Sequence, residues 1–435
     1  MTAFIIVYLF ALIVLVKWSK YKILCNELFW LGTFWSLIIG VYICSGISFN
    51  SYGLSFELLF FLTLCLGSLL VGRRKGMTSP LILPTLQIRK RRLYYFSLLG
   101  VLGIIIYIID ILRLNGLSAI IFREAGMKTE LEISLIGTIG SLFVSLLLVI
   151  GAYLVADKIR NSNSISIVGV FMMFLYTLPC MMHSGRETIL FVIITMISLY
   201  GYKKMLKTQK NGIIKFKTLM IRTFLLLVGS LIIFLFYSIS QDRFTEGLSN
   251  VFLESHDLPS KTVDEAQSWG ELKFLYVNFL SYFCHQIPFL DFVLKEYDGP
   301  YMFGVYELNI ISRRLPESLG LNYLTVYDEL NRLYQRNHTD FGTGWQTVLG
   351  SFIVDFGRIG AVFVCFFCGL FMGKVRKQFK KTLDARYAVM VSLLCMSSFS
   401  TIQLGPFYQN MIYGAYFWWI ILFYWGSKSK LHEAI

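Results

Sequence analysis

Eleven apolar runs divide this chain of 435 residues, and each is close to the length that a helix needs to cross a bilayer. About 20 apolar residues span the roughly 30 Å of hydrocarbon in a membrane. With 56% hydrophobic and 15% charged residues, the chain has the composition of an integral membrane protein. We therefore predict an all-α polytopic membrane protein with about 11 transmembrane helices. The predicted spans are Thr2–Val16, Leu28–Ser45, Tyr52–Val71, Tyr94–Leu112, Ile133–Ala156, Ile165–Met182, Thr188–Tyr202, Thr218–Ser240, Thr347–Gly373, Tyr387–Ile402 and Tyr408–Trp425.

The basic residues of the short loops fall on one side of these spans. About 26 of the 40 Lys and Arg lie in these loops or in the C-terminal tail. The positive-inside rule makes this side cytoplasmic, so the N-terminus is predicted to be periplasmic and the C-terminus cytoplasmic. The net charge of +14 is then explained by loops that face anionic lipid, and no nucleic-acid partner is expected. The basic groups are Lys17–Lys22, Arg73–Lys75 with Arg89–Arg92, Lys203–Lys217 and Lys374–Arg386.

One long hydrophilic interval, residues 241–345, holds 15 of the 26 acidic residues. It divides the chain into residues 1–240 with eight spans, a large periplasmic loop that is partly helical, and residues 346–435 with three spans and a short cytoplasmic tail. The apolar stretch Leu272–Leu294 inside this loop is interpreted as packed loop structure or a re-entrant segment. A further crossing would place the basic run Lys374–Arg386 outside.

Charged residues near the membrane are candidates for function. Arg186 lies in a short turn between two spans on the outer side, and its planar guanidinium suits a phosphate or pyrophosphate. The alternatives for Arg186 are interfacial snorkelling or pairing with Glu187. Arg358 follows Asp355 by three residues, so the two could pair along one helix face. Arg123 lies in another outer loop and is either solvated or faces the site.

Within the long loop, the tract Arg336–Trp345 has the highest density of side chains that could bind a ligand or transfer a proton. His338 can accept a proton from a sugar hydroxyl near neutral pH, and Asp340 is a second candidate base. Aromatic side chains such as Tyr334 and Trp345 suit either sugar rings or the headgroup interface. Each of these residues, taken alone, is also consistent with a solvated side chain. The candidates for binding pyrophosphate or glycan are Arg123, Arg243, Arg313, Arg314, Arg336, Arg358, Tyr334 and Trp345.

The sequence contains no P-loop, Rossmann fingerprint or HExxH motif. Cys365 and Cys368 have CxxC spacing but lie in an apolar run without a second ligand pair, so they are interpreted as small core residues. We expect no metal and no cofactor. An activated substrate would have to supply the driving force.

The turn Ser184–Thr188 after the sixth span, the single large outer loop and the tract Phe341–Gly360 resemble the Wzy-type O-antigen polymerases (oligosaccharide repeat-unit polymerases). The resemblance implies a GT-C-like glycosyltransferase of the bacterial inner membrane, independent of nucleotide and metal. It would move a growing glycan from undecaprenyl pyrophosphate to the non-reducing end of the next lipid-linked repeat unit. It also implies a chain-length regulator of the polysaccharide co-polymerase type as a partner. The family's outer-loop arginines correspond to Arg186 by its tract, and to Arg123, Arg243, Arg313 and Arg314 by location; the Arg-x10-Gly spacing of some members is not found at Arg123, Arg186, Arg243 or Arg314.

The expected mechanism is an inverting transfer in which His338 or Asp340 is the base and Arg186 neutralises the departing pyrophosphate. Three alternatives remain: an O-antigen ligase, a flippase or other transporter of lipid-linked oligosaccharide, and a structural assembly protein. The interval between His338 and Gly357 is longer than in the ligase pattern, which favours the polymerase. A transporter is disfavoured because the sequence shows no convincing internal repeat.

Overall fold

The computed structural model describes residues 25–44, 51–72, 88, 90–121, 134–182, 187–209, 290, 293–306, 308, 315–319, 347–401 and 410–425. The regular structure of these residues is entirely helical, as predicted. The helices are α2 (Glu27–Cys44), α3 (Ser51–Gly72), α4 (Lys90–Ile121), α5 (Leu135–Ser162), α6 (Ile167–Met182), α7 (Glu187–Gln209), α13 (Leu315–Ser318), α15 (Thr347–Thr382), α16 (Ala385–Ser400), α17 (Asn410–Trp419) and the π-helical η3 (Ile420–Trp425).

Nine predicted spans coincide with helices α2 to α7 and α15 to η3. The other two, Thr2–Val16 and Thr218–Ser240, lie outside the described residues. Within the described residues, α4, α5, α7 and α15 each contain a stretch long and apolar enough to cross a membrane. This length and composition are those of a multi-pass membrane protein.

Four helices run well beyond the ends of the predicted spans. Helix α4 continues to Ile121 instead of Leu112, α5 to Ser162 instead of Ala156, α7 to Gln209 instead of Tyr202, and α15 to Thr382 instead of Gly373. Hydropathy marks where a helix leaves the hydrocarbon, but the i to i−4 hydrogen bonds continue until a cap stops them. In α5 the stop is Asn163, which has a left-handed conformation (φ 55°) and donates its backbone N–H to the carbonyl of Ile159.

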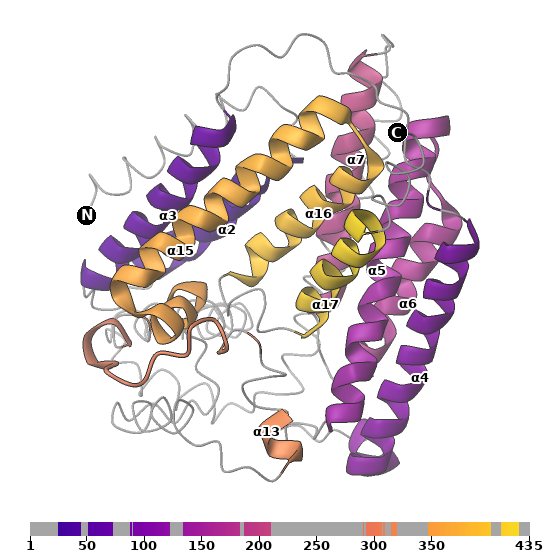
Figure 1. The fold of residues 1–435 in the computed structure, drawn as a ribbon, viewed down its shortest axis with the longest axis horizontal. Helices are drawn as coiled ribbons and strands as arrows, with labels where there is room; N and C mark the ends of the chain where they lie inside the picture. Colours follow the sequence, from indigo (N-terminus) through magenta and orange to yellow (C-terminus); the bar gives the residue numbers. More distant parts are fainter. Residues whose placement is uncertain are drawn as a thin grey trace, which may run out of the picture.

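The helices form two groups that meet at a shared centre (Figure 1). Helices α4, α5 and α6 pack together on one side, and α3 packs against α15 on the other. Helix α16 joins the two groups, because it contacts α2 and α15 as well as α5, α7 and α17. Its side chains are therefore buried from Ala388 to Ser400.

The helix pairs approach closely through glycines. In α5 and α6, an added Cβ on either Gly151 or Gly169 would meet the carbonyl oxygen of the other at 2.6 Å. In α3 and α15, a Cβ on Gly67 or Gly369 would overlap the backbone of the opposite helix. Close approach through small residues is the usual packing of membrane helices, which gain no hydrophobic free energy by leaving lipid.

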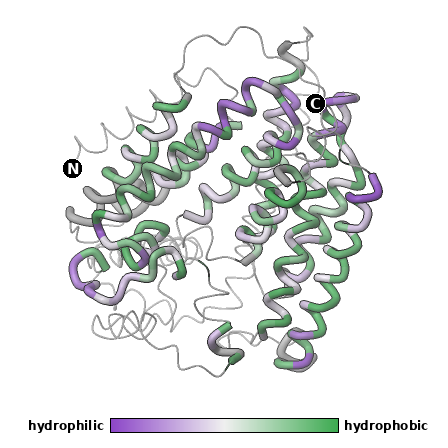
Figure 2. The backbone as a smooth tube through the Cα atoms, in the orientation of Figure 1, coloured by the Kyte–Doolittle hydropathy of each residue, from purple (hydrophilic) through white to green (hydrophobic). Residues whose placement is uncertain are grey.

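Basic residues gather at one end of the bundle, which we call the basic end. Arg386 pairs with Asp384 at 2.8 Å, and Arg160 of α5 lies 4.0 Å from the same carboxylate. The Tyr202 hydroxyl of α7 donates to the carbonyl of Leu383 at 2.7 Å. The ends of α5 and α7 and the turn between α15 and α16 therefore meet, so the two basic runs that begin in α7 and in α15 begin at the same end of the bundle. Figure 2 shows hydrophilic residues at this end of α15, with apolar residues along the helix middles.

Candidate functional site

The end of the bundle opposite the basic end, which we call the loop end, holds the described part of the long loop. Residues 293–306 and α13 belong to this loop, and the first turns of α15 lie beside it (Figure 1). Arg358 is the single predicted site residue among the described residues. The other predicted site residues lie outside them: Arg123, Arg186, Arg243, Arg313, Arg314, Tyr334, Arg336, His338, Asp340 and Trp345.

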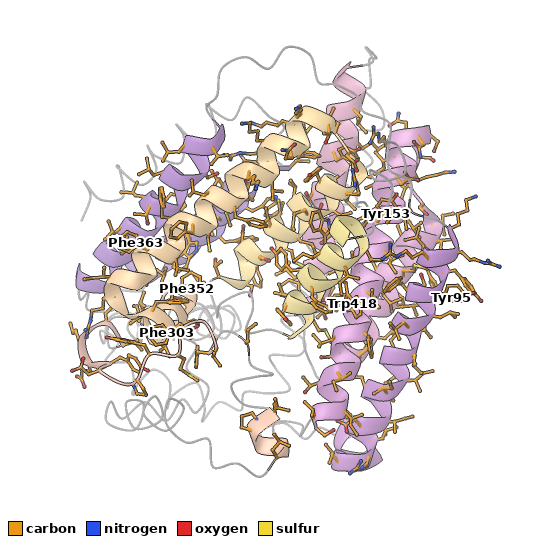
Figure 3. The ribbon with its side chains drawn as sticks, viewed as in Figure 1. Tyr95, Tyr153, Phe303, Phe352, Phe363 and Trp418 are labelled. Atoms are coloured by element: carbon orange, nitrogen blue, oxygen red, sulfur yellow. The ribbon has the colours of Figure 1, made fainter. Side chains whose placement is uncertain are left out.

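Helix α15 is broken at Gly357. This residue has φ 72° and ψ 174°, so residues 347–356 form a short piece set apart from the long remainder of the helix. The break needs glycine, because such a positive φ is costly for a residue with a Cβ and a Cβ here would lie 3.1 Å from the Tyr301 ring. Phe352 on the short piece and Phe363 on the long piece are labelled in Figure 3. The continuous span predicted over Thr347–Gly373 is therefore two helical pieces.

The Arg358 guanidinium binds the backbone of the long loop. Its Nε donates to the carbonyl of Leu294 at 2.6 Å, and its Nη2 donates to the carbonyls of Lys295 at 3.2 Å and Tyr297 at 3.4 Å. These carbonyls belong to the end of a short helical turn, where no intrahelical donors remain for them. Arg358 thus caps this turn with a positive charge, where the partial charge of a helix end is negative.

Asp355 binds the same loop segment from the other side of the break. Its side chain is fully buried, and its Oδ1 accepts the backbone N–H of Tyr306 at 3.0 Å. The backbone carbonyl of Asp355 accepts the N–H of Phe303 at 2.8 Å. We call Asp355, Gly357 and Arg358 the α15 clamp, because the carboxylate and the backbone carbonyl of Asp355 each accept one N–H of this segment and the Arg358 guanidinium donates to three of its carbonyls.

The clamp replaces the ion pair expected along one helix face. Asp355 and Arg358 are three residues apart, but Gly357 interrupts the helix between them and the i, i+3 geometry is lost. Each side chain is instead directed to a different part of residues 294–306. The expected pairing of Asp355 with Arg358 is therefore wrong, and both side chains bind backbone groups of the long loop instead.

Apolar packing supports the clamp. Leu290, Val293, Leu294, Tyr297 and Tyr306 are at most 4% exposed and form one cluster with buried side chains of the short piece of α15. Each such side chain contributes on the order of 1.5 to 3 kcal/mol when it leaves water. Three residues of the stretch Leu272–Leu294 thus pack against α15, namely Leu290, Val293 and Leu294. The rest of the stretch, residues 272–289 and 291–292, lies outside the described residues.

A second charged group lies inside the bundle and was not predicted. Glu27 at the start of α2 is fully buried, and its Oε1 lies 3.3 Å from Nη1 of Arg376 on α15. Arg376 also donates from Nη2 to the Ser68 hydroxyl of α3 at 2.7 Å and to the Ser68 carbonyl at 3.1 Å. Glu27 borders a predicted span and could have been flagged as an acid at membrane depth. Arg376 was hidden in a basic run that topology alone explains.

Replacing Arg358 with methionine is expected to free the loop segment while keeping the side-chain length. Three carbonyls lose a charged donor, which costs about 2 kcal/mol, so the amides of Phe303 and Tyr306 should exchange about 30-fold faster with deuterium. Hydrogen exchange with mass spectrometry on the detergent-solubilised protein measures this. Arg113→Met is the matched control, because Arg113 is an exposed arginine of α4 near the loop end of the bundle. Equal exchange in wild type and Arg358→Met would show that the guanidinium does not hold the segment.

No family model matches this chain, and no curated protein and no solved structure matches it. Its class comes from its own structure: an all-α protein with four helices, among the described residues, that are long and apolar enough to cross a membrane.

Proposed function

We propose that this protein is an O-antigen polymerase of the bacterial inner membrane. It transfers a growing glycan from undecaprenyl pyrophosphate to the non-reducing end of the next lipid-linked repeat unit, at the periplasmic face. The acceptor hydroxyl attacks the anomeric carbon of the donor sugar while the bond from that carbon to the pyrophosphate breaks. His338 or Asp340 takes the proton of the hydroxyl, and Arg186 neutralises the charge that develops on the leaving pyrophosphate.

The observation that carries the proposal is the tract Phe341–Gly360, which connects the end of the long loop to the apolar helix α15. In the sequence, the first part of this tract directly follows the candidate bases His338 and Asp340. The second part contains the α15 clamp, which fastens residues 294–306 to the loop end through Asp355 and Arg358. A loop fastened in this way can hold groups at the membrane surface with little motion, which a transfer between two lipid-linked substrates requires.

The charge distribution is consistent with a reaction at the periplasmic face. The last turns of α7 and α15, in which the two basic runs begin, meet at the basic end, and the fastened loop lies at the other. Under the positive-inside rule the loop end is periplasmic. The activated donor carries its own leaving group, so the reaction proceeds without a nucleotide sugar. A co-polymerase partner would then set the length of the product.

The test is the lipopolysaccharide banding pattern of a host strain that lacks this gene. The deletion should leave core plus a single repeat unit, and wild type should restore the ladder. Arg186→Ala should lower polymer formation about 100-fold, because one charge at a developing pyrophosphate is lost. Arg91→Ala is the matched control, since Arg91 is exposed at the start of α4 on the basic end.

The banding pattern also separates the alternatives. Bare core without a single-repeat band would indicate a ligase or a flippase, and an unchanged ladder would remove the protein from this pathway. Polymer of normal yield from the Arg186→Ala strain would leave the polymerase in place but remove Arg186 from the reaction.

A further inference from the structure

Two helices break in the same way at the loop end. Helix α4 is interrupted at Gly116 with φ 73° and ψ 168°, and α15 at Gly357 with φ 72° and ψ 174°. Each break lies close to an Asp-x-x-Arg segment: Gly116 follows the segment Asp110–Arg113 by three residues, and Gly357 lies within the segment Asp355–Arg358. Both carboxylates are buried, with 2% of Asp110 and none of Asp355 exposed. The two segments are far apart in the chain and belong to the two different helix groups.

Each carboxylate accepts a backbone N–H from a residue of a returning loop. The Oδ2 of Asp110 accepts from the N–H of Ser134 at 2.9 Å, and its Oδ1 accepts from the Ser134 hydroxyl. Ser134 is the N-cap of α5, so this contact closes the connection between α4 and α5 at its last residue. The Oδ1 of Asp355 accepts from the N–H of Tyr306 in the long loop at 3.0 Å.

A buried carboxylate costs more hydration free energy than a neutral acceptor, but it forms stronger hydrogen bonds. A buried carboxylate loses several kcal/mol of hydration, which a neutral acceptor such as asparagine would lose only in part. In return, hydrogen bonds to an ionised acceptor are shorter and roughly twice as strong as neutral ones. Asp110 and Asp355 therefore fix the point at which each loop returns more firmly than packing alone.

We infer that Asp110 and Asp355 are a matched pair of positioning residues that set where the two outer loops are fastened relative to each other. Asp110 fastens the connection that carries Arg123, and Asp355 fastens the long loop that carries Arg313 and Arg314. Resting on the proposed function, the pair sets the spacing between the arginines of the two loops that bind pyrophosphate or glycan. Neither carboxylate takes part in the chemical step.

The fastening is tested without reference to activity, by adding protease to spheroplasts that carry alanine or asparagine variants. Asp355→Ala should speed cleavage at least 10-fold within residues 290–319, and Asp110→Ala should do so within residues 121–134. Each change should stay in its own loop. The asparagine variants keep an acceptor oxygen but lose the charge, so cleavage should be intermediate between the alanine variants and wild type.

Unchanged cleavage in both alanine variants would overturn the inference. So would an equal increase in both loops, because that would mean general unfolding. Ser134→Ala keeps the Ser134 N–H and removes only its hydroxyl, so it should give a smaller increase confined to residues 121–134. This milder variant decides the question for α4 if Asp110→Ala does not accumulate.

The same strains are then compared for their lipopolysaccharide ladders. Each alanine variant should lower polymer yield at least 10-fold, and each asparagine variant should give a yield between those of the alanine variant and wild type. Local cleavage with an unchanged ladder would overturn the role in spacing the substrates. If wild type itself makes no ladder in the deletion strain, the polymerase proposal fails, while the protease result still decides whether the two carboxylates fasten the loops.

Discussion

Replacing Arg376 with methionine is expected to lower the free energy of unfolding by about 3 to 5 kcal/mol, the cost of leaving a buried charge without its partner. In wild type, Arg376 lies 3.3 Å from the fully buried Glu27 and donates to the hydroxyl and carbonyl of Ser68. Methionine keeps the apolar stem but removes the guanidinium that pairs with the Glu27 carboxylate. Thermal unfolding of the purified protein in detergent measures the loss as a lower Tm and as a smaller folded fraction.

Lys374→Met is the control for Arg376→Met, because Lys374 is exposed on the same helix and should leave Tm unchanged. The double variant Glu27→Leu/Arg376→Met removes both charges and should recover most of the stability, since a buried ion pair is often replaced by apolar side chains without loss. A double variant as unstable as Arg376→Met alone would contradict the assignment of the pair. The hydrogen bonds to Ser68 would then be the main contribution of Arg376.

Replacing Gly369 with leucine should prevent α3 and α15 from packing. A Cβ at this position would overlap the carbonyl oxygen of Leu64, and the adjacent backbone of α3 offers no side chain that could move aside. The helices must separate, so we expect destabilisation of about 3 kcal/mol or more, at or above the upper end for overpacked sites. The measurement is the yield of monodisperse protein after solubilisation, together with Tm.

Phe367→Leu is the matched change for Gly369→Leu, because Phe367 lies on the same helix and is 62% exposed. It should give wild-type yield and Tm. Gly369→Ala should be intermediate, since it adds only the first clashing atom. Normal yield from Gly369→Leu would mean that α3 and α15 do not approach as closely as the structure places them.

Most of the helical architecture follows from the sequence alone. Long apolar runs predicted nine helices that the structure contains, from Leu28–Ser45 to Tyr408–Trp425. The reason is local: each residue contributes its own transfer free energy, and in hydrocarbon the backbone can satisfy its hydrogen bonds only within a helix. The common side of the runs at Lys203 and Lys374 was also predictable, because charge position in short loops depends on topology and not on packing.

Two residues of the candidate site could be predicted from the sequence, but their contacts could not. Sequence reasoning selected Asp355 and Arg358 because acid and base at this spacing share a helix face. It missed that Gly357 turns the chain between them, since a glycine in an apolar run is as often a packing contact as a break. It also overlooked Asp110, whose partner Ser134 lies beyond an intervening loop.

The sequence by itself determined the class of protein, the position of most helices and the end of the bundle where basic residues gather. Tertiary structure decided which polar groups bind one another: Arg358 with the carbonyls of residues 294–297, Asp355 with Tyr306, and Arg376 with Glu27 and Ser68. The free energies of helix formation and of transfer into the membrane are sums of contributions from single residues, so they can be estimated from the sequence. A buried charge takes the partner that packing brings near, and for Arg376 and Ser68 that partner is 308 residues away.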